Sequence, residues 1–213
     1  MPNSFYYAAN SYLDEWLRED SKFHRILAFA KRFETSAGAG TKCLVEVSKY
    51  YSVARTLRDI GEDCRLKAAY DALQKTEPPE DGDVVTKVES FARVLGGIYG
   101  VVPLSAASKF LWMRFRNPVV IFDSVVSGWL NRNCGYKYDG YSTYHKIWSG
   151  KYREFENQIR LACDELKSIK KFTLADQESD ETITEWTSSR WFAERVFDHF
   201  MLNDSIESQQ AGN

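Results

Sequence analysis

The chain has 213 residues, of which 44% are hydrophobic, 15% aromatic and 27% charged, and its formal net charge is −2 at pH 7. This length and apolar content allow a sizeable buried core in one domain or two closely packed helical lobes, and they exclude fibrous and disordered classes. We expect neither a signal peptide nor a membrane span, because no apolar run approaches the ~20 residues that cross a bilayer. A cytoplasmic protein without a membrane partner is therefore expected.

The cysteines and histidines are scattered along the chain. They are Cys43, Cys64, Cys134, Cys163, His24, His145 and His199. Zinc and iron–sulfur sites cluster their ligands at short spacings. We therefore expect no metal and no cofactor, and we expect the thiols to remain reduced.

Apolar residues recur at helical spacing along most of the chain, and no stretch alternates between apolar and polar residues as a strand does. The sequence therefore predicts an all-α protein. Ser4 and Thr41 are candidate N-caps of two helices, because short polar side chains accept hydrogen bonds from the free N–H groups of a first turn. Another helix is expected to start between them, at Asp20 or Ser21.

A helix predicted over 63–75 is broken by the segment 77–83, which contains two prolines and a glycine. This segment is the expected boundary between an N-terminal lobe, 1–77, and a second lobe, 84–202. The helices predicted beyond the boundary begin at Val84, Pro103, Asp123 and Ser142, and the last spans 182–202. The polar tail, 203–213, is predicted to be disordered.

The stretch from Gly100 to Leu130 contains two of these helices, joined by a short extended segment. Pro103 suits a first helical position, and Asn117-Pro118 ends that helix near residue 116. The helix covers roughly 10 Å from Lys109 to its end, whereas the extended return covers up to about 20 Å. The chain can therefore double back past Lys109 before Asp123 caps the next helix.

Lys109 and Asp123 could share one cleft, beside an apolar wall formed by residues 119–122. A lysine and an aspartate beside such a wall are the parts of a Schiff-base site. Burial favours the neutral, reactive form of a lysine, and a carboxylate can move protons or stabilise positive charge. The non-catalytic alternatives are a solvated lysine and an aspartate that serves only as a helix cap.

Ser108-Lys109 followed by Pro118-Val119-Val120-Ile121-Phe122-Asp123-Ser124 resembles the helix-hairpin-helix DNA glycosylases, and is most similar to short bacterial proteins described as 8-oxoguanine DNA glycosylase-like. The resemblance covers about residues 85–132, with a weaker similarity over 190–200. It implies a two-lobed helical fold with a central cleft. It also implies that Lys109 attacks the sugar C1′ of a flipped-out damaged nucleotide while Asp123 assists departure of the base, and that β-elimination can follow.

The chain departs from the family pattern in two places. The hairpin of the family is usually rich in glycine, and here the turn reads Val101-Val102-Pro103-Leu104-Ser105-Ala106-Ala107. The interval between the lysine and the aspartate is also a few residues shorter.

Charge is distributed unevenly. Residues 101–171 hold 12 basic and 6 acidic side chains, whereas residues 172–213 hold 2 and 9. A basic middle is typical of a partner with a phosphate backbone, although a solvated helix face gives the same count. Candidate DNA-binding residues are Ser105, Trp112, Arg114, Arg116, Arg132 and Lys137, and candidate walls of a base pocket are Phe192, Phe197 and Phe200. Core packing is the alternative for Trp112 and the three phenylalanines.

The resemblance thus implies a DNA N-glycosylase that excises an oxidised purine such as 8-oxoguanine through a lysine Schiff base. One alternative is a non-catalytic module on the same fold that binds nucleic acid or a partner protein. For such a module, the resemblance to short bacterial members implies an accessory role in antiviral defence. A purely structural helical protein is a third reading.

Overall fold

The computed structural model describes residues 4–29, 37–57, 63–135 and 137–211. Within these ranges the chain is helical with short turns and contains no strand, which confirms the all-α class. It forms two compact units: unit 1 comprises Met1–Glu19 and Asp123–Asn213, and unit 2 comprises Asp20–Phe122.

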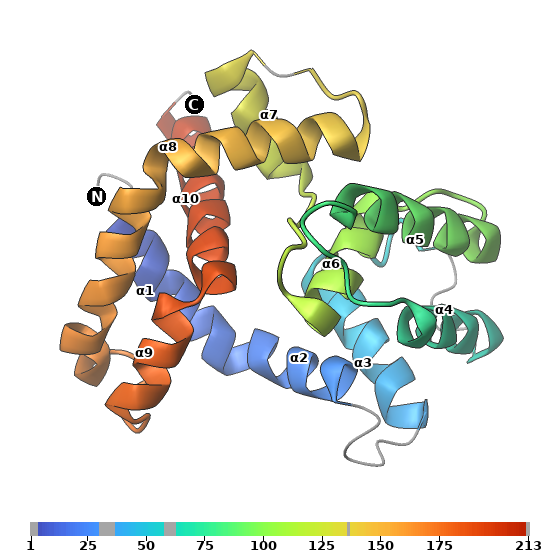
Figure 1. Cartoon of the computed structure of the whole chain (residues 1–213), viewed down its shortest axis with the longest axis horizontal. Helices are drawn as coiled ribbons and strands as arrows, with labels where there is room; N and C mark the ends of the chain where they lie inside the picture. The colour runs from blue at the N-terminus through green and yellow to red at the C-terminus, as the bar shows by residue number, and fades with distance from the viewer. Residues whose placement is uncertain (1–3, 30–36, 58–62, 136, 212–213) are drawn as a thin grey trace. The chain divides into compact units, whose positions relative to one another are not determined.

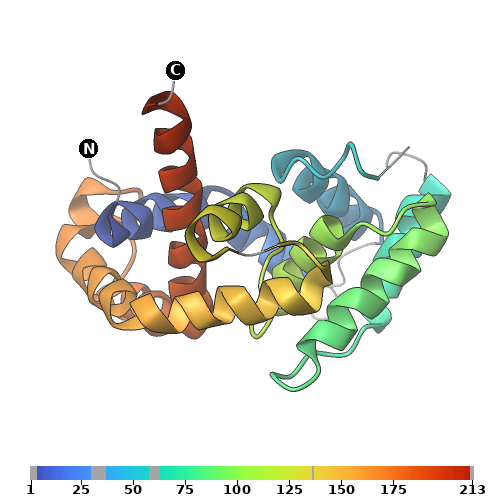
Figure 2. The same cartoon turned by 90° about the horizontal axis from the view of Figure 1, so that it is seen from above.

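Unit 1 is built around its last helix. Its helices are α1 (Phe5–Glu15), α7 (Ser124–Cys134), α8 (Gly140–Ile169), α9 (Asp180–Ser188) and α10 (Arg190–Ala211). Helix α10 contacts the other four, and α1 also contacts α8 (Figure 1 and Figure 2). Aromatic rings fill the space between them, with Tyr12, Phe192 and Phe197 fully buried. The first and last parts of the chain therefore share one core.

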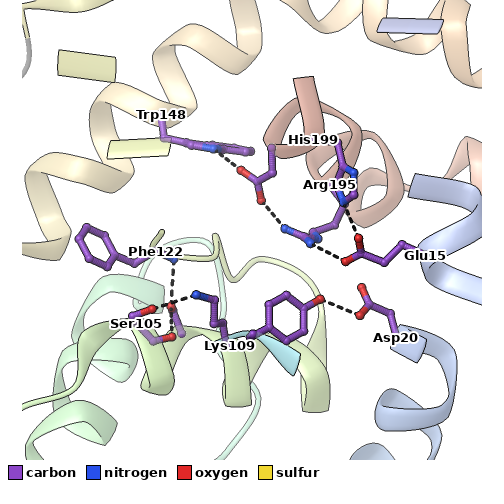
Figure 3. A network of polar contacts seen from close by, with 11 residues as sticks. Glu15, Asp20, Ser105, Lys109, Phe122, Trp148, Arg195 and His199 are labelled. Carbon is purple, nitrogen blue, oxygen red and sulfur yellow. Dashed lines mark hydrogen bonds and ion pairs between the residues drawn. The ribbon is translucent and has the colours of Figure 1, made fainter. Parts of the chain in front are cut away.

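Charged side chains are also buried in unit 1, where they bond to one another (Figure 3). Asp198 accepts hydrogen bonds from the indole N–H of Trp148 and from the guanidinium of Arg195, both at 2.8 Å. Glu15 lies 3.6 Å from Arg195 and 3.3 Å from Nε2 of His199. Burial raises the pKa of Asp198, and the neighbouring Arg195 and Trp148 oppose that rise. The network joins α1, α8 and α10.

Unit 2 contains α2 (Ser21–Ala28), α3 (Ala37–Tyr50), α4 (Asp63–Lys75), α5 (Val84–Tyr99) and α6 (Leu104–Phe115). Helix α6 contacts α2, α3 and α5, and α4 contacts α3 and α5. The chain bends by 118° between α5 and α6. Gly100 permits this turn because it adopts φ 77°, a conformation that side chains with a Cβ disfavour. The pair has the geometry of a helical hairpin.

The division of the chain differs from the predicted boundary. The segment 77–83 lies between α4 and α5, inside unit 2. The first nineteen residues join unit 1 because α1 packs on α8 and α10. Pattern along the sequence locates breaks between helices, but long-range packing decides which helices form a unit.

Two helices extend further than predicted. Helix α10 continues to Ala211, into the segment expected to be a disordered tail, because α7 holds it: the indole of Trp129 donates to Asp204 at 2.8 Å and Arg132 donates to Ser205 at 3.0 Å. Helix α3 starts at Ala37, so Thr41 lies inside it rather than at its N-cap. There, a Cβ on Gly40 would lie 2.3 Å from the ring of Tyr70 on α4, so a glycine permits the two helices to approach.

Among the residues that the structure describes, no single helix is long and apolar enough to cross a membrane. Only α5 and α6 taken together, across their 118° bend, reach the length and composition of a span.

The imidazole of His24 links α2 to α6. Its Nδ1 lies 2.8 Å from the carbonyl oxygen of Met113, so Nδ1 carries the hydrogen and donates. Burial, together with the nearby guanidinium of Arg116, lowers the pKa of His24 to about 4. The buried histidine is therefore neutral in the folded protein at pH 7.

This depressed pKa predicts a pH dependence of stability. An unfolded chain takes up a proton at His24 near pH 6.5, whereas the folded chain takes it up only near pH 4. The free energy of unfolding is expected to fall as the pH is lowered through this window, by on the order of 3 kcal/mol from this residue. Urea unfolding of the wild type and of His24→Asn, which keeps a donor for Met113, measures it. Equal pH dependence in both proteins would contradict the assignment.

Candidate functional site

Lys109 lies in the middle of a helix that is buried on all sides. Every residue from Ala106 to Met113 on α6 is buried, and all but Ser108 and Lys109 are apolar. A helix that is apolar around its whole circumference belongs in a core. The apolar neighbours of Lys109 on α6 therefore bury it with them, and only 3% of the residue is exposed.

Two groups of unit 2 hold the amine of Lys109. Its Nζ donates a hydrogen bond of 2.9 Å to the hydroxyl of Ser105, one helical turn earlier (Figure 3). The same Nζ lies 5.7 Å from the centre of the Tyr51 ring. A cation within about 6 Å of an aromatic face is attracted to it. The predicted nucleophile is thus placed by a hydroxyl and an aromatic face.

The ring of Tyr51 is itself anchored to a buried carboxylate. Tyr51 follows α3 directly, and its hydroxyl donates a 2.6 Å hydrogen bond to Oδ1 of Asp20. Asp20 ends the π-helical stretch Trp16–Asp20 and is fully buried. A buried carboxylate requires hydrogen bonds, because its desolvation is otherwise costly.

The extended segment after α6 folds back along α6, the helix that carries Lys109, as predicted. Helix α6 ends at Phe115, one residue before the predicted end. Val119, Val120 and Ile121 are buried. The backbone N–H of Phe122 then donates a 2.9 Å hydrogen bond to the hydroxyl of Ser108, the residue next to Lys109. The chain therefore doubles back within unit 2 to the level of Lys109.

Asp123 begins the second segment of unit 1. It is the N-cap of α7, as predicted, since its Oδ1 accepts a 2.8 Å hydrogen bond from the N–H of Val125. The backbone of Asp123 also bonds to the hydroxyl of Tyr144, whose pKa is raised well above its usual value by burial and by the carboxylates of Asp198 and Asp123. Because Lys109 and Asp123 belong to different units, their shared cleft stays a prediction.

The other predicted residues of α6 are engaged in unit 2. Trp112 is only 1% exposed and lies in the core, so its ring is not presented to a ligand. The half-buried guanidinium of Arg114 donates to the carbonyl groups of Leu73, Thr76 (2.8 Å) and Gln74 (3.1 Å), at the C-terminal end of α4. Arg116 is half-buried at the end of α6 with φ 60°. A phosphate contact by Arg114 would have to replace its three carbonyl partners.

The remaining predicted residues lie in unit 1. Arg132 is exposed on α7, where it bonds to Ser205, and Lys137 is exposed in the turn before α8. Phe192 and Phe197 are fully buried in the core. Phe200 lines a pocket of about 430 Å³ together with Phe5, Phe155 and other side chains of α1 and α8. Phe200 therefore faces a pocket, whereas Phe192 and Phe197 are packed in the core.

Sequence reasoning missed the contact of Tyr51 with Lys109 and the hydrogen bond of Tyr51 to Asp20. The helix was expected to start at Asp20 or Ser21, and α2 starts at Ser21. The side chain of Asp20 makes no capping bond, because the chain is already helical through the stretch before it. The spacing of Tyr51 from Leu44 and Val47 in the sequence is that of an apolar helix face, and this pattern gave no separate signal for its hydroxyl.

Among the described residues, no group of three histidine, cysteine, aspartate or glutamate side chains is placed to hold a metal ion.

No protein-family model, no curated protein and no solved structure matches the chain. The residues of the chain and their geometry therefore carry its functional interpretation.

The contacts of Arg114 predict a structural role that can be measured. Arg114→Ala leaves the last carbonyl groups of α4 without their donors, so the free energy of unfolding is expected to fall by about 1–3 kcal/mol. Urea unfolding at neutral pH measures this change. Arg132→Ala is the matched control, because Arg132 is exposed on α7 and donates to one hydroxyl, that of Ser205, whereas Arg114 donates to three carbonyl groups. A smaller loss, below about 1 kcal/mol, is expected. An Arg114→Ala protein of wild-type stability with weakened DNA binding would instead favour the phosphate role.

Proposed function

We propose that this protein is a DNA N-glycosylase that acts through Lys109 on an oxidised purine such as 8-oxoguanine, and that it cuts the strand afterwards by β-elimination. The single observation that carries the proposal is the buried amine of Lys109, held by Ser105 and Tyr51 on a helix that begins directly after a hairpin turn. The similarity of this segment to helix-hairpin-helix DNA glycosylases supplies the reaction.

The chemistry requires a neutral amine and a leaving base. The lone pair of the Lys109 amine attacks C1′ of the flipped-out nucleotide, the bond from C1′ to the base breaks, and its electron pair leaves with the base, which takes up a proton. Loss of a proton from the amine and opening of the sugar give a Schiff base. The proposed part of Asp123 is to stabilise the positive charge that develops on the sugar. No metal or cofactor is needed for these steps.

A binding module without catalysis is the second candidate, and one observation favours it. The tip of the hairpin presents Val102, which is 60% exposed, in place of glycines whose backbone N–H groups would grip a phosphate. An exposed apolar tip suits contact with an apolar surface of a partner protein better than contact with a phosphate.

The first test removes the nucleophile. Lys109→Gln is expected to abolish base release and borohydride trapping on DNA that carries 8-oxoguanine or an abasic site. DNA affinity should change little, because one side chain contributes little to an interface with many phosphates. Excision and trapping are measured on labelled duplexes, and affinity by titration at fixed salt. Wild-type protein that releases no base and forms no adduct would leave the binding module as the better proposal.

The second test separates the two steps. Asp123→Asn keeps an oxygen acceptor for the N–H of Val125, so α7 should stay capped. It removes the negative charge, and excision is expected to drop by ~10²-fold or more. Trapping at a pre-formed abasic site should survive in large part, because the base has already left. Equal losses in both assays would argue against this division of roles.

A further inference from the structure

The amine of Lys109 has an aromatic neighbour whose own position is fixed from another element. Tyr51 lies at the end of α3, where its backbone N–H still donates to the carbonyl of Val47 at 2.9 Å. Its ring faces the Lys109 amine and its hydroxyl reaches the Asp20 carboxylate before α2. One side chain thus connects the nucleophile of α6 to two other helices of unit 2.

We propose that Tyr51 and Asp20 are positioning residues for Lys109. The 2.6 Å bond to Asp20 sets the tilt of the Tyr51 ring, and the face of the ring, together with the Ser105 hydroxyl 2.9 Å from Nζ, determines where the amine sits. This inference rests on the proposed role of Lys109 as nucleophile. The partner it serves is a C1′ electrophile, such as an abasic sugar aldehyde.

The geometry explains why a long, flexible side chain can act as a nucleophile from within a core. A lysine has four rotatable bonds, and ordering them costs conformational free energy. Contacts on two sides of the amine supply that order before a substrate arrives. Reactive groups must be held within a fraction of an ångström, since a misplacement of ~1 Å can reduce a rate by ~10²-fold.

A series of substitutions tests the proposal on duplex DNA with an abasic site under borohydride. Tyr51→Leu removes the aromatic face, and the single-turnover rate of trapping is expected to fall by about 10- to 100-fold. Tyr51→Phe keeps the face but loses the bond to Asp20, so its rate should lie between those of wild type and Tyr51→Leu. Asp20→Asn keeps an acceptor for the hydroxyl and should restore most of the rate that Asp20→Ala loses. The dissociation constant for DNA should stay within about threefold throughout, as expected of residues that contact no phosphate.

Tyr99→Leu is the matched control, because Tyr99 is a buried tyrosine of unit 2, on α5, and the substitution removes the same ring. It should trap at nearly the wild-type rate. Trapping at the wild-type rate by Tyr51→Leu, or an equal loss in Tyr99→Leu, would overturn the proposal. Thermal unfolding identifies any variant that fails to fold.

A second readout keeps the inference separate from the glycosylase proposal, since wild-type protein that forms no adduct would count against the enzyme alone. The NMR signals of the Lys109 methylene next to Nζ, identified by their loss in Lys109→Gln, are expected upfield of ordinary lysine signals because the chain end lies over the ring. Tyr51→Phe should keep this shift and Tyr51→Leu should remove it. Identical signals in wild type and Tyr51→Leu would show that the ring does not place the amine, whatever the enzyme does.

Discussion

The hydroxyl of Ser108 makes the connection on which the arrangement around Lys109 depends. It donates to the carbonyl of Ser105 at 3.2 Å and accepts the N–H of Phe122 at 2.9 Å. The buried backbone of the return segment needs such a partner, because an N–H without an acceptor in a core is costly. A single serine thus lets the chain leave α6, turn back and end unit 2 beside the helix that carries the lysine.

Other buried polar groups are likewise satisfied by specific hydrogen-bond partners. Asp20 receives the hydroxyl of Tyr51, Asp198 receives Trp148 and Arg195, and the carbonyl groups at the end of α4 receive Arg114. Removing one member of such a set leaves the other buried and unsatisfied, which is why these sites are sensitive to substitution. In unit 2, the bond from Tyr51 to Asp20 fixes a ring beside the Lys109 amine, and the bonds of Arg114 tie α6 to the end of α4.

Local signals in the sequence predicted the local features. Pro103 and Asn117-Pro118 located α6 to within a residue, and Asp123 caps α7 as its side chain suggested. Features that depend on packing were not predictable in this way. Asp20 and Tyr51 are 31 positions apart and meet only because α2 and α3 both pack on α6. Arg114 looked like a surface cation, and its fold back onto α4 has no signature in the pattern of charges. The glycosylase reaction and the DNA partner remain proposals, and they are based on the residues around Lys109.

The composition of unit 1 from two separate segments has a consequence for how the chain acquires its structure during synthesis. All contacts within unit 2 become available once residue 122 has been made, whereas α1 must wait for α8 and α10 before its apolar face is covered. Closing that core joins residues separated by more than ~100 positions, and contacts so distant in sequence form slowly. Helix α1 is therefore expected to be among the last helices to pack. Until it packs, the ring of Tyr12, which is buried in the folded protein, stays exposed and can make non-native contacts.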